Sequence, residues 1–228
     1  MKAQYNFKRI EKKYLITTYQ YEAFMMEVNQ HLKDDAYTSF TVNNIYFDTD
    51  DDYLIRRSIS KPLYKEKLRL RGYNDVEDDQ AFLEIKKKYN KVVYKRRVNV
   101  NINELGDDLD LSQSENQISK ELEFFIDRYD PKPKYYLGYK RQAYVGVNEP
   151  GLRITIDNDI TYRFDDLNLK SGLYGKKLLD EDQLIMEIKT DKAMPLWLVK
   201  ALNDNKIYPT SYSKVGNVYT KELIESRG

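Results

Sequence analysis

The stretch "KEKLRLRG", residues 65–72, decides the fold, because basic and apolar side chains alternate along it. Successive side chains of a β-strand point to opposite faces of the sheet. Four cations therefore share one face, and Glu66, Leu68 and Leu70 share the other. The cations are Lys65, Lys67, Arg69 and Arg71. Such a row is either an ordinary solvated strand face or the wall of a site for a highly negative ligand.

The composition describes a folded chain without a strong overall charge. The 228 residues are 41% hydrophobic and 33% charged, with 21 Tyr and 8 Phe, which is typical of a globular protein rich in strand-forming residues. The formal net charge is +1, so the whole molecule offers no field that would draw it to nucleic acid or to an anionic membrane. A polyanion site must therefore come from local segregation of charge. Residues 56–97 are rich in Lys and Arg, whereas residues 103–127 are acidic.

Several classes of protein are excluded by what the chain lacks. It has no cysteine, so disulfides, thiolate metal sites and a cysteine nucleophile are ruled out. No apolar run is as long as a membrane span, and the start "MKAQYNFKRIEKK" lacks the apolar core of a signal peptide. We therefore expect a soluble, cytoplasmic protein with no direct membrane insertion.

Eight segments are predicted to be strands, because they alternate or are rich in Val, Ile, Tyr and Phe. They lie near 6–16, 38–47, 63–73, 80–88, 91–100, 134–145, 152–162 and 183–190. Turns such as 89–91 leave little room for a crossover, which favours antiparallel hairpins. We expect one domain over residues 1–228 and flexible loops at 101–110 and 165–182.

Helices are predicted in some of the gaps between these strands. Thr17 and Gln20 fit a capping box at the start of the first helix, and Ser114 with Gln117 repeats the pattern. A third helix is expected to begin at Pro195. The acidic run at 48–52 favours a helix N-terminus over a calcium loop, since the loop position that needs Gly is Tyr53.

The alternation of charge recurs on almost every predicted strand. The sets that share a face are Arg9, Glu11 and Lys13; Glu84, Lys86 and Lys88; Lys95 and Arg97; Tyr139 and Arg141; Arg153, Thr155 and Asp157; and Glu187 and Lys189. For a single strand, a solvated face is the default. Across many strands the default weakens, because like charges on neighbouring strands repel and need a counter-charge.

A barrel would give these rows a function. If the sheet closes with its apolar side outward under helices, the charged rows line a channel suited to a chain of phosphates. Arginine would give bidentate hydrogen bonds, and lysine would give point charges. The acids Glu11, Glu84, Asp157 and Glu187 suit Mg²⁺ or Mn²⁺ that bridges phosphate oxygens, or they simply pair with neighbouring cations.

A series of motifs resembles a known family in the expected order. The motifs are "FKRIEKKYLI", "VNNIYFDT", "YKEKLRLRGY", "FLEIKKK", "VVYKRRV", "YKRQAY", "LRITID", "LIMEIKT" and "SYSKVGN". They cover most of the chain, which resembles the VTC domain, the polyphosphate polymerase domain of the triphosphate tunnel metalloenzyme (CYTH) superfamily. The resemblance implies an α+β fold: an eight-stranded antiparallel closed β-barrel, the triphosphate tunnel, with flanking helices.

The same resemblance implies an activity and its residues. The VTC branch transfers the terminal phosphoryl group of ATP to a polyphosphate chain, with Mn or Mg as the divalent metal. The implied catalytic residues are Lys13, Arg69, Arg71, Lys86, Arg141, Arg153 and Lys214, with Glu187 as metal ligand and Glu11 as a second one. The wider substrate-binding set adds Arg9, Lys67, Arg97 and Lys189. The implied partners are ATP and polyphosphate or triphosphate, and a membrane-protein partner stays open.

Three alternatives to a polymerase are a hydrolase, a module that only binds polyanions, and a protein that binds single-stranded nucleic acid. The superfamily opens with Glu-x-Glu-x-Lys, but here Arg9 precedes Glu11 and Lys13, which favours the polymerase branch over the hydrolases. A metal-dependent hydrolase of inorganic or organic triphosphates stays open, as does a non-catalytic module that holds polyphosphate or another polyanion. Single-stranded nucleic acid would need aromatic side chains among the cations, but most tyrosines are predicted on the opposite face or in helices, so no nucleic acid is expected.

Overall fold

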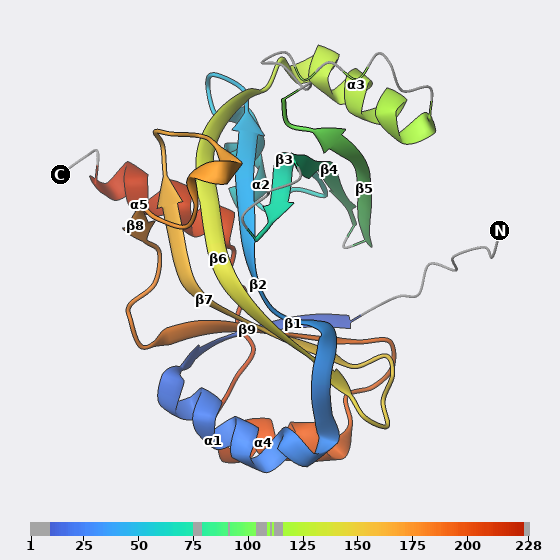
Figure 1. Ribbon diagram of the computed structural model, residues 1–228, viewed down its shortest axis with the longest axis vertical. Helices are drawn as coiled ribbons and strands as arrows, with labels where there is room; N and C mark the ends of the chain where they lie inside the picture. Colours follow the sequence, from blue (N-terminus) through green and yellow to red (C-terminus); the bar gives the residue numbers. More distant parts are fainter. Residues whose placement is uncertain are drawn as a thin grey trace. The chain divides into compact units, whose positions relative to one another are not determined.

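The computed structural model describes residues 10–74, 79–90, 92–103, 109, 111 and 116–225 (Figure 1). The strands are β1 (Ile10–Thr17), β2 (Leu32–Asp48), β3 (Tyr64–Tyr73), β4 (Gln80–Tyr89), β5 (Val92–Asn101), β6 (Lys132–Gly146), β7 (Arg153–Arg163), β8 (Lys176–Lys177) and β9 (Gln183–Thr190). The α-helices are α1 (Thr18–Val28), α2 (Tyr53–Ile59), α3 (Gln117–Tyr129), α4 (Leu196–Asp204) and α5 (Lys214–Glu225). Short 3₁₀ turns cover Asn29–His31 and Leu169–Ser171. The α+β class is confirmed.

The described strands form one antiparallel sheet of nine strands rather than eight. Their order is β1-β9-β7-β6-β2-β3-β4-β5, and the short β8 pairs with β7. The strands β1 and β5 are therefore the two ends of the order, and within the described ranges no ladder of hydrogen bonds joins them. The predicted closed barrel is thus not confirmed: the sheet is not closed by hydrogen bonds.

The chain divides into two compact units. The first comprises the described part of Met1–Phe40, with Lys140–Ile160 and Leu179–Ser213, and the second comprises the described parts of Thr41–Tyr139, Thr161–Leu178 and Lys214–Gly228. The strands β2, β6 and β7 each have one end in each unit, because the divisions fall inside them. Each unit has a hydrophobic core of its own.

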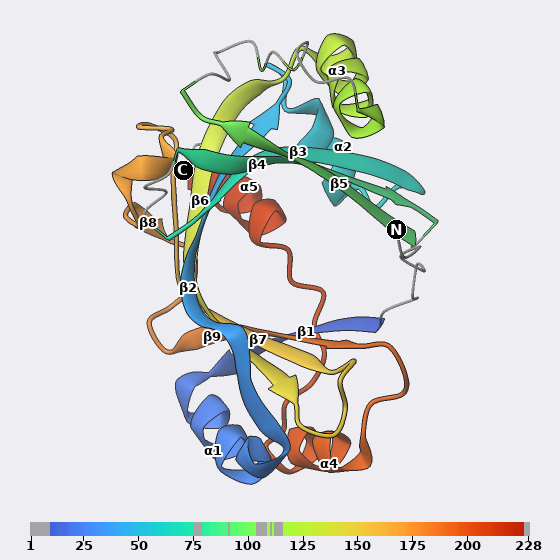
Figure 2. The same cartoon turned by 45° about the vertical axis from the view of Figure 1, so that its right-hand side comes forward.

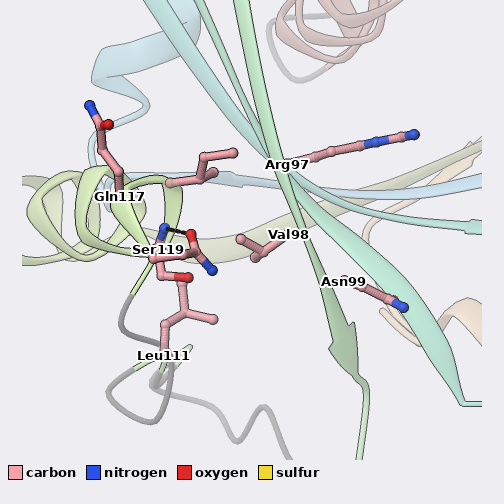
Figure 3. Close-up of a pocket in the computed structure, with 8 residues that line it drawn as sticks. Arg97, Val98, Asn99, Leu111, Gln117 and Ser119 are labelled. Atoms are coloured by element: carbon pink, nitrogen blue, oxygen red, sulfur yellow. Dashed lines mark hydrogen bonds between the residues drawn. The ribbon is translucent and has the colours of Figure 1, made fainter. Parts of the chain in front are cut away.

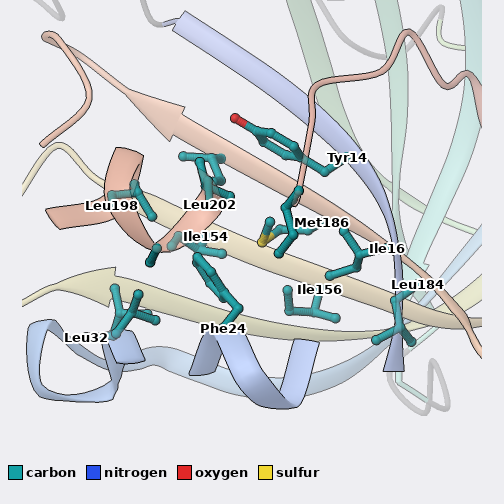
Figure 4. Close-up of a cluster of buried hydrophobic side chains, with 14 of the residues drawn as sticks. Tyr14, Ile16, Phe24, Leu32, Ile154, Ile156, Leu184, Met186, Leu198 and Leu202 are labelled. Carbon is teal, nitrogen blue, oxygen red and sulfur yellow. The ribbon is translucent and has the colours of Figure 1, made fainter. Parts of the chain in front are cut away.

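The core of the first unit lies between one face of its strands and the helices α1 and α4. Alternate residues of the strands, such as Tyr14, Ile154 and Met186, pack with Phe24 of α1 and Leu198 of α4 (Figure 4). All five of these side chains are almost fully buried. This cluster fixes which face of β1, β9 and β7 is apolar, so the charged residues that alternate with it lie on the other face.

The core of the second unit lies on the apolar face of β3 and β4. Leu68 and Leu70 of β3 pack with Leu83 and Ile85 of β4, and Phe125 of α3 belongs to the same cluster. Figure 2 shows α3 beside β5 on this side of the hairpins. The alternation predicted from residues 65–72 is confirmed, because its apolar members are buried in this core.

The helix starts follow the predicted signals, with small shifts. The capping box of Thr17 and Gln20 is present at α1. The helix α3 begins at Gln117 with Asn116 as its N-cap; the predicted cap, Ser114, lies outside the described residues. Pro195 is the N-cap of α4 rather than its first residue. In the acidic run, the carboxylate of Asp48 accepts hydrogen bonds from the backbone N–H groups of Leu54 and Ile55 at the start of α2.

The segment 165–182, predicted to be a flexible loop, is held in place by an arginine. The buried guanidinium of Arg163 donates hydrogen bonds to the carbonyl oxygens of Asp166, Asn168, Gly172 and Tyr174, at 3.0 to 3.2 Å. Its carbon Cζ also lies 3.6 Å from the ring centre of Tyr136 and 4.2 Å from that of Tyr174. The local pattern could not show this, since Gly, Asp and Asn usually signal a loop.

Among the helices of the described residues, none combines the length and the apolar character needed to cross a membrane.

Candidate functional site

Cations of β3, β4 and β5 share one face of the second unit. The register opposes Lys67 to Lys86 and Lys86 to Lys95, so three lysines stand in one row across three strands. The neighbouring row runs from Arg69 through Glu84 to Arg97. We call this surface the first cationic face; its members are Lys67, Arg69, Arg71, Lys86, Lys95 and Arg97. Like charges in direct opposition destabilise a sheet, so nearby negative charge stabilises this row, and part of it comes from Glu84, which pairs with Lys95.

A buried carboxylate, Glu84, holds the arginine and lysine side chains of this face. Its side chain is 1% exposed and accepts hydrogen bonds from Nε and Nη2 of Arg69 at 2.8 and 2.6 Å. Lys95 Nζ lies 2.6 Å from its second oxygen. Burial raises the pKa of Glu84, but the charges of Arg69, Arg71 and Lys95 outweigh it and lower the pKa to about 2. Glu84 is therefore a permanent anion that positions cations, and of its two predicted roles the structure supports pairing.

Polar residues of β2 and β6 orient the two arginines. Arg71 Nε donates to Asn44 Oδ1 at 2.8 Å, and Arg69 Nη1 donates to Tyr46 Oη at 3.1 Å. Arg71 Nη2 lies 3.4 Å from Tyr139 Oη. Sequence reasoning missed Asn44 and Tyr46 as part of the site, although their alternation with buried apolar residues of β2 places them on this face. Burial lowers the pKa of Arg69, but Tyr46 and Glu84 raise it by more, so the guanidinium stays charged.

Lys214 joins this set from the other end of the chain. It is the first residue of α5, and its Nζ lies 4.7 Å from the ring centre of Tyr139, the side chain that also contacts Arg71. A cation near a ring face is attracted by the ring's quadrupole. The predicted Lys214 therefore lies near Arg71, with Tyr139 contacting both side chains.

Arg97 lies at the margin of the first cationic face. Its guanidinium carbon lies 4.6 Å from the ring centre of Phe82. Figure 3 shows Arg97 and Asn99 pointing away from α3, while Val98 points toward it. The pocket drawn there, about 390 Å³ in volume, is lined by Val98, Leu111 and Ile118 among others. It opens on the apolar side of β5, so we do not assign it to phosphate binding.

Charged residues of β1, β9 and β7 share one face of the first unit. The register opposes Lys13 to Glu187 and Glu11 to Lys189. Glu187 lies 3.2 Å from Lys13 Nζ and 3.4 Å from Lys189 Nζ, whereas Glu11 lies 3.9 and 3.8 Å from the same two nitrogens. We call this surface the second cationic face; its cations are Lys13, Arg141, Arg153 and Lys189.

The two arginines of the second cationic face are both paired. Arg141 donates to both oxygens of Asp157, from Nε at 2.6 Å and from Nη2 at 2.8 Å. The side chain of Asp157 is fully buried, so it resembles Glu84 in holding a guanidinium from behind. Arg153 Nη2 lies 2.8 Å from Asp35 of β2, and its side chain is 45% exposed. Asp157, considered as a metal ligand, is thus an arginine partner, and Asp35 was not identified from the sequence.

The side chains that could hold the predicted metal ion are few. Within the described ranges, no group of three or more His, Asp or Glu side chains could hold a metal ion. Glu187 and Glu11 offer two carboxylates, and the hydroxyl of Thr155, opposite Glu187 in the register, is buried without a hydrogen-bond partner. Mg²⁺ is often held by one or two carboxylates with waters and substrate phosphates as its remaining ligands. The residues fit such an ion and do not form a complete site by themselves.

The predicted site residues thus fall into two sets, one on each unit. The first holds Lys67, Arg69, Arg71, Lys86, Arg97 and Lys214; the second holds Glu11, Lys13, Arg141, Arg153, Glu187 and Lys189. Arg9 lies outside the described residues. The residues that sequence reasoning did not identify are the neighbours that hold the cations: Asn44, Tyr46 and Asp35.

One solved structure supports this fold, and a second is reported beside it. A putative adenylate cyclase from Bacillus halodurans has a similar structure, with a TM-score of 0.54 at 13% identity over 90% of this chain and 93% of that one. A putative adenylate cyclase from Vibrio parahaemolyticus gives a TM-score of 0.49 at 12% identity over 92% of this chain and 97% of that one. No curated protein matches this sequence.

A family model adds what these distant structures cannot show. The model of the VTC domain matches residues 8–221, which is nearly the whole chain and includes every predicted site residue. The chain therefore belongs to the VTC domain family, a branch of the triphosphate tunnel enzymes.

Proposed function

We propose that the protein is an ATP-dependent polyphosphate polymerase, which transfers the terminal phosphoryl group of ATP to the end of a polyphosphate chain. Membership of the VTC domain family supports an enzyme that acts on triphosphates. The observation that carries the proposal is the row Lys67, Lys86 and Lys95, in which three like charges oppose one another on adjacent strands. Lys95 is paired with Glu84, and a substrate with closely spaced phosphates would bring further negative charge to the row as a whole.

Fixed cations would supply most of the catalysis. Phosphoryl transfer asks little covalent chemistry of a protein and depends on positioning and on neutralising charge. Arg69, Arg71, Lys86, Arg141 and Arg153 would bind phosphates, and Lys13 and Lys214 would neutralise the reacting groups. Glu84 and Asp157 hold two of these guanidinium groups before substrate arrives. Little reorganisation is then needed in the transition state.

The chemistry of the acceptor favours synthesis over hydrolysis. The terminal phosphate of a growing chain is already an anion and can attack without a general base, whereas hydrolysis benefits from a base that orients and deprotonates water. Glu84, with its pKa at about 2, cannot accept a proton at neutral pH. The one histidine of the chain, His31, is stacked on Trp197 with ring centres 4.4 Å apart. Neither residue therefore offers a base for water.

A divalent ion would be held by Glu187, with Glu11 as a weaker second ligand. Glu187 has the shorter contacts to both lysines and is 9% exposed, against 39% for Glu11. When bound, Mg²⁺ or Mn²⁺ neutralises charge on phosphate oxygens. The chain's own part is to keep Lys13 and Lys189 beside these carboxylates.

The products of ATP distinguish the proposal from its alternatives. The protein is incubated with ATP labelled at the terminal phosphate, together with Mn²⁺ or Mg²⁺, and the products are separated by size. We expect a long labelled polymer. Free labelled phosphate without polymer would instead indicate a triphosphate hydrolase, and unchanged ATP would indicate a module that only binds polyanions.

A further inference from the structure

A group of lysines extends the first cationic face toward the turn that joins β4 to β5. Lys65 is two residues before Lys67 on β3, and the register opposes it directly to Lys88 of β4. Because cross-strand neighbours share a face, both lysines lie on the side of Lys67 and Lys86. Beside the row of Lys67 and Lys86 there is thus a second pair of opposed lysines, Lys65 and Lys88, with no carboxylate between them.

Lys61 belongs to the same group. It stands in the connection between α2 and β3, and the carbonyl of Leu63 in this connection accepts a hydrogen bond from Asn90 N of the β4–β5 turn at 2.9 Å. Partial burial lowers the pKa of Lys65, and the charges of Lys88 and Lys61 lower it further. The ammonium group of Lys65 is therefore repelled by those of Lys88 and Lys61. We call Lys61, Lys65 and Lys88 the outer lysine cluster.

The outer lysine cluster has no acidic partner in the described part of the chain. No carboxylate oxygen of the described residues lies within 4.0 Å of Nζ of Lys61, Lys65 or Lys88. Lys65 Nζ donates to the carbonyl of Ser58 at 2.9 Å, which uses one of its three N–H donors. By contrast, Lys95 and Arg69 of the neighbouring rows are paired with Glu84. A protein that only needed a solvated face would mix signs here.

The cations along β3 extend over a greater length than a triphosphate can contact. From Arg71 to Lys65 the strand advances six residues, or about 20 Å at roughly 3.3 Å per residue. A triphosphate is three tetrahedra that share two oxygens, and it is much shorter than this row. The cations beyond Lys67 and Lys86 can therefore meet additional phosphates only if the bound molecule is a longer chain.

We propose that the outer lysine cluster is a binding site for the distal phosphates of a long polyphosphate, so that the protein binds a long chain in preference to a triphosphate. This inference rests on the part of the proposed function that assigns phosphate binding to the first cationic face. It adds a chain-length preference and the residues that would cause it.

The test compares two probes and two pairs of substitutions. Affinities of long-chain polyphosphate and of tripolyphosphate are measured by calorimetry at one fixed salt concentration, for the full chain and for the double variant K61Q/K88Q. The matched control is K120Q/K192Q, which removes two exposed lysine charges outside the cluster. Each lysine that contacts the chain also releases counterions, so the salt dependence of binding is measured as well.

We expect K61Q/K88Q to weaken long-chain binding roughly tenfold more than it weakens tripolyphosphate binding, with a shallower salt dependence. The control should keep the chain-length preference of the unmodified protein. Equal losses for the two probes, or no loss for either, would overturn the inference. If the double variant does not fold, K61G keeps the test, because Lys61 has a φ of 54° that glycine adopts without strain.

The outcome also separates this inference from the proposed function. If the protein makes polymer from ATP but K61Q/K88Q has the same length preference as the unmodified chain, the cluster is not a binding site and the polymerase proposal stands. If the protein makes no polymer but loses its length preference in K61Q/K88Q, the activity proposal fails and the cluster stands as a polyphosphate site.

Discussion

Each arginine at the centre of the two cationic faces has a buried acid or amide behind it. Glu84 holds Arg69, Asp157 holds Arg141, and Asn44 holds Nε of Arg71. A guanidinium fixed in this way loses less rotamer freedom when it binds a phosphate. The acids that share a face with the cations thus mostly hold arginine side chains in place, and Glu187 and Glu11 are the two that remain as candidate metal ligands.

Glu84 allows a stability prediction with a definite pH dependence. The variant E84Q leaves Arg69 and Lys95 without their shared anion, so we expect the free energy of unfolding at pH 7 to fall by about 3 kcal/mol. The folded-state pKa, about 2, lies below the ordinary value of 4.5. The stabilisation is therefore present above pH 4.5 and is lost as the pH falls toward 2.

Urea unfolding of both proteins across this pH range checks the prediction. The difference between wild type and E84Q should shrink as the pH falls, because a protonated Glu84 resembles glutamine. The control E222Q removes an acid paired with the exposed Lys176 and should cost less than about 1 kcal/mol. A difference that is constant with pH would show that the stabilisation does not come from the ionised carboxylate.

Glu187 is the residue whose loss should stop the reaction. In E187Q the neutral amide would bind a divalent ion poorly, so we expect turnover of ATP to fall roughly 100-fold or more. Its partners Lys13 and Lys189 are partly exposed, so the substitution should lower the free energy of unfolding by only about 1 kcal/mol. Glu11, with longer contacts and greater exposure, gives the comparison E11Q, for which a smaller loss is expected. Full turnover by E187Q would remove Glu187 from the mechanism.

At the scale of elements, Arg163 determines how the segment after β7 is arranged. One guanidinium binds four carbonyl oxygens of this segment and lies between two tyrosine rings. The following pair of residues, Lys176–Lys177, can then add to the edge of β7 as β8. A strand of two residues has no periodicity, so the local sequence could not predict it, and tertiary contacts such as the hydrogen bond from Lys221 Nζ to the carbonyl of Lys177 also hold it.

The substitution R163K tests this role. Lysine keeps the charge but cannot reach four carbonyls in a plane, so we expect a loss of about 2 kcal/mol and faster amide hydrogen exchange over residues 164–177. The control R56K changes an exposed arginine that pairs with Asp51 and should leave exchange in this segment unchanged. Exchange that stays slow in R163K would mean that other contacts order the segment.

The long strands could be predicted from the sequence because one face of each is buried, so apolar residues recur at every second position. β2 starts at Leu32 rather than near residue 38. The pattern did not predict these first residues because they include two adjacent acids, and one of these acids pairs with Arg153. The helix α5 was not predicted, because Val215, Gly216 and Val218 are weak helix formers. It is stabilised instead by burial, with Val218 fully buried.

In the candidate site, too, some residues could be predicted from the sequence and others could not. The rows of cations could be read from the sequence, because charge repeats with the period of a strand. Their partners Asn44, Tyr46 and Asp35 could not, because each contact joins strands that are distant in sequence and depends on the register between them. The closed barrel was likewise implied by resemblance alone, and the hydrogen-bonding pattern does not confirm it.

At the scale of the whole molecule, the net charge of +1 conceals strongly segregated charge. Binding of tripolyphosphate should therefore depend on local cations, and its affinity should fall several-fold when salt rises from about 50 mM to about 200 mM. Single-stranded DNA spaces its phosphates with sugars, and Tyr46 and Tyr139 contact arginines through their hydroxyl groups. We expect DNA to compete poorly in a displacement assay at equal phosphate concentration. Equal competition would indicate a general polyanion site.

The most direct measurement is a crystal structure of the protein with tripolyphosphate and Mn²⁺. We predict phosphate oxygens within hydrogen-bonding distance of Arg69, Arg71 and Lys86, with the guanidinium groups still held by Glu84 and Asn44. Tripolyphosphate bound elsewhere, with no phosphate oxygen in contact with these three side chains, would contradict the assignment of the first cationic face and with it the proposed reaction.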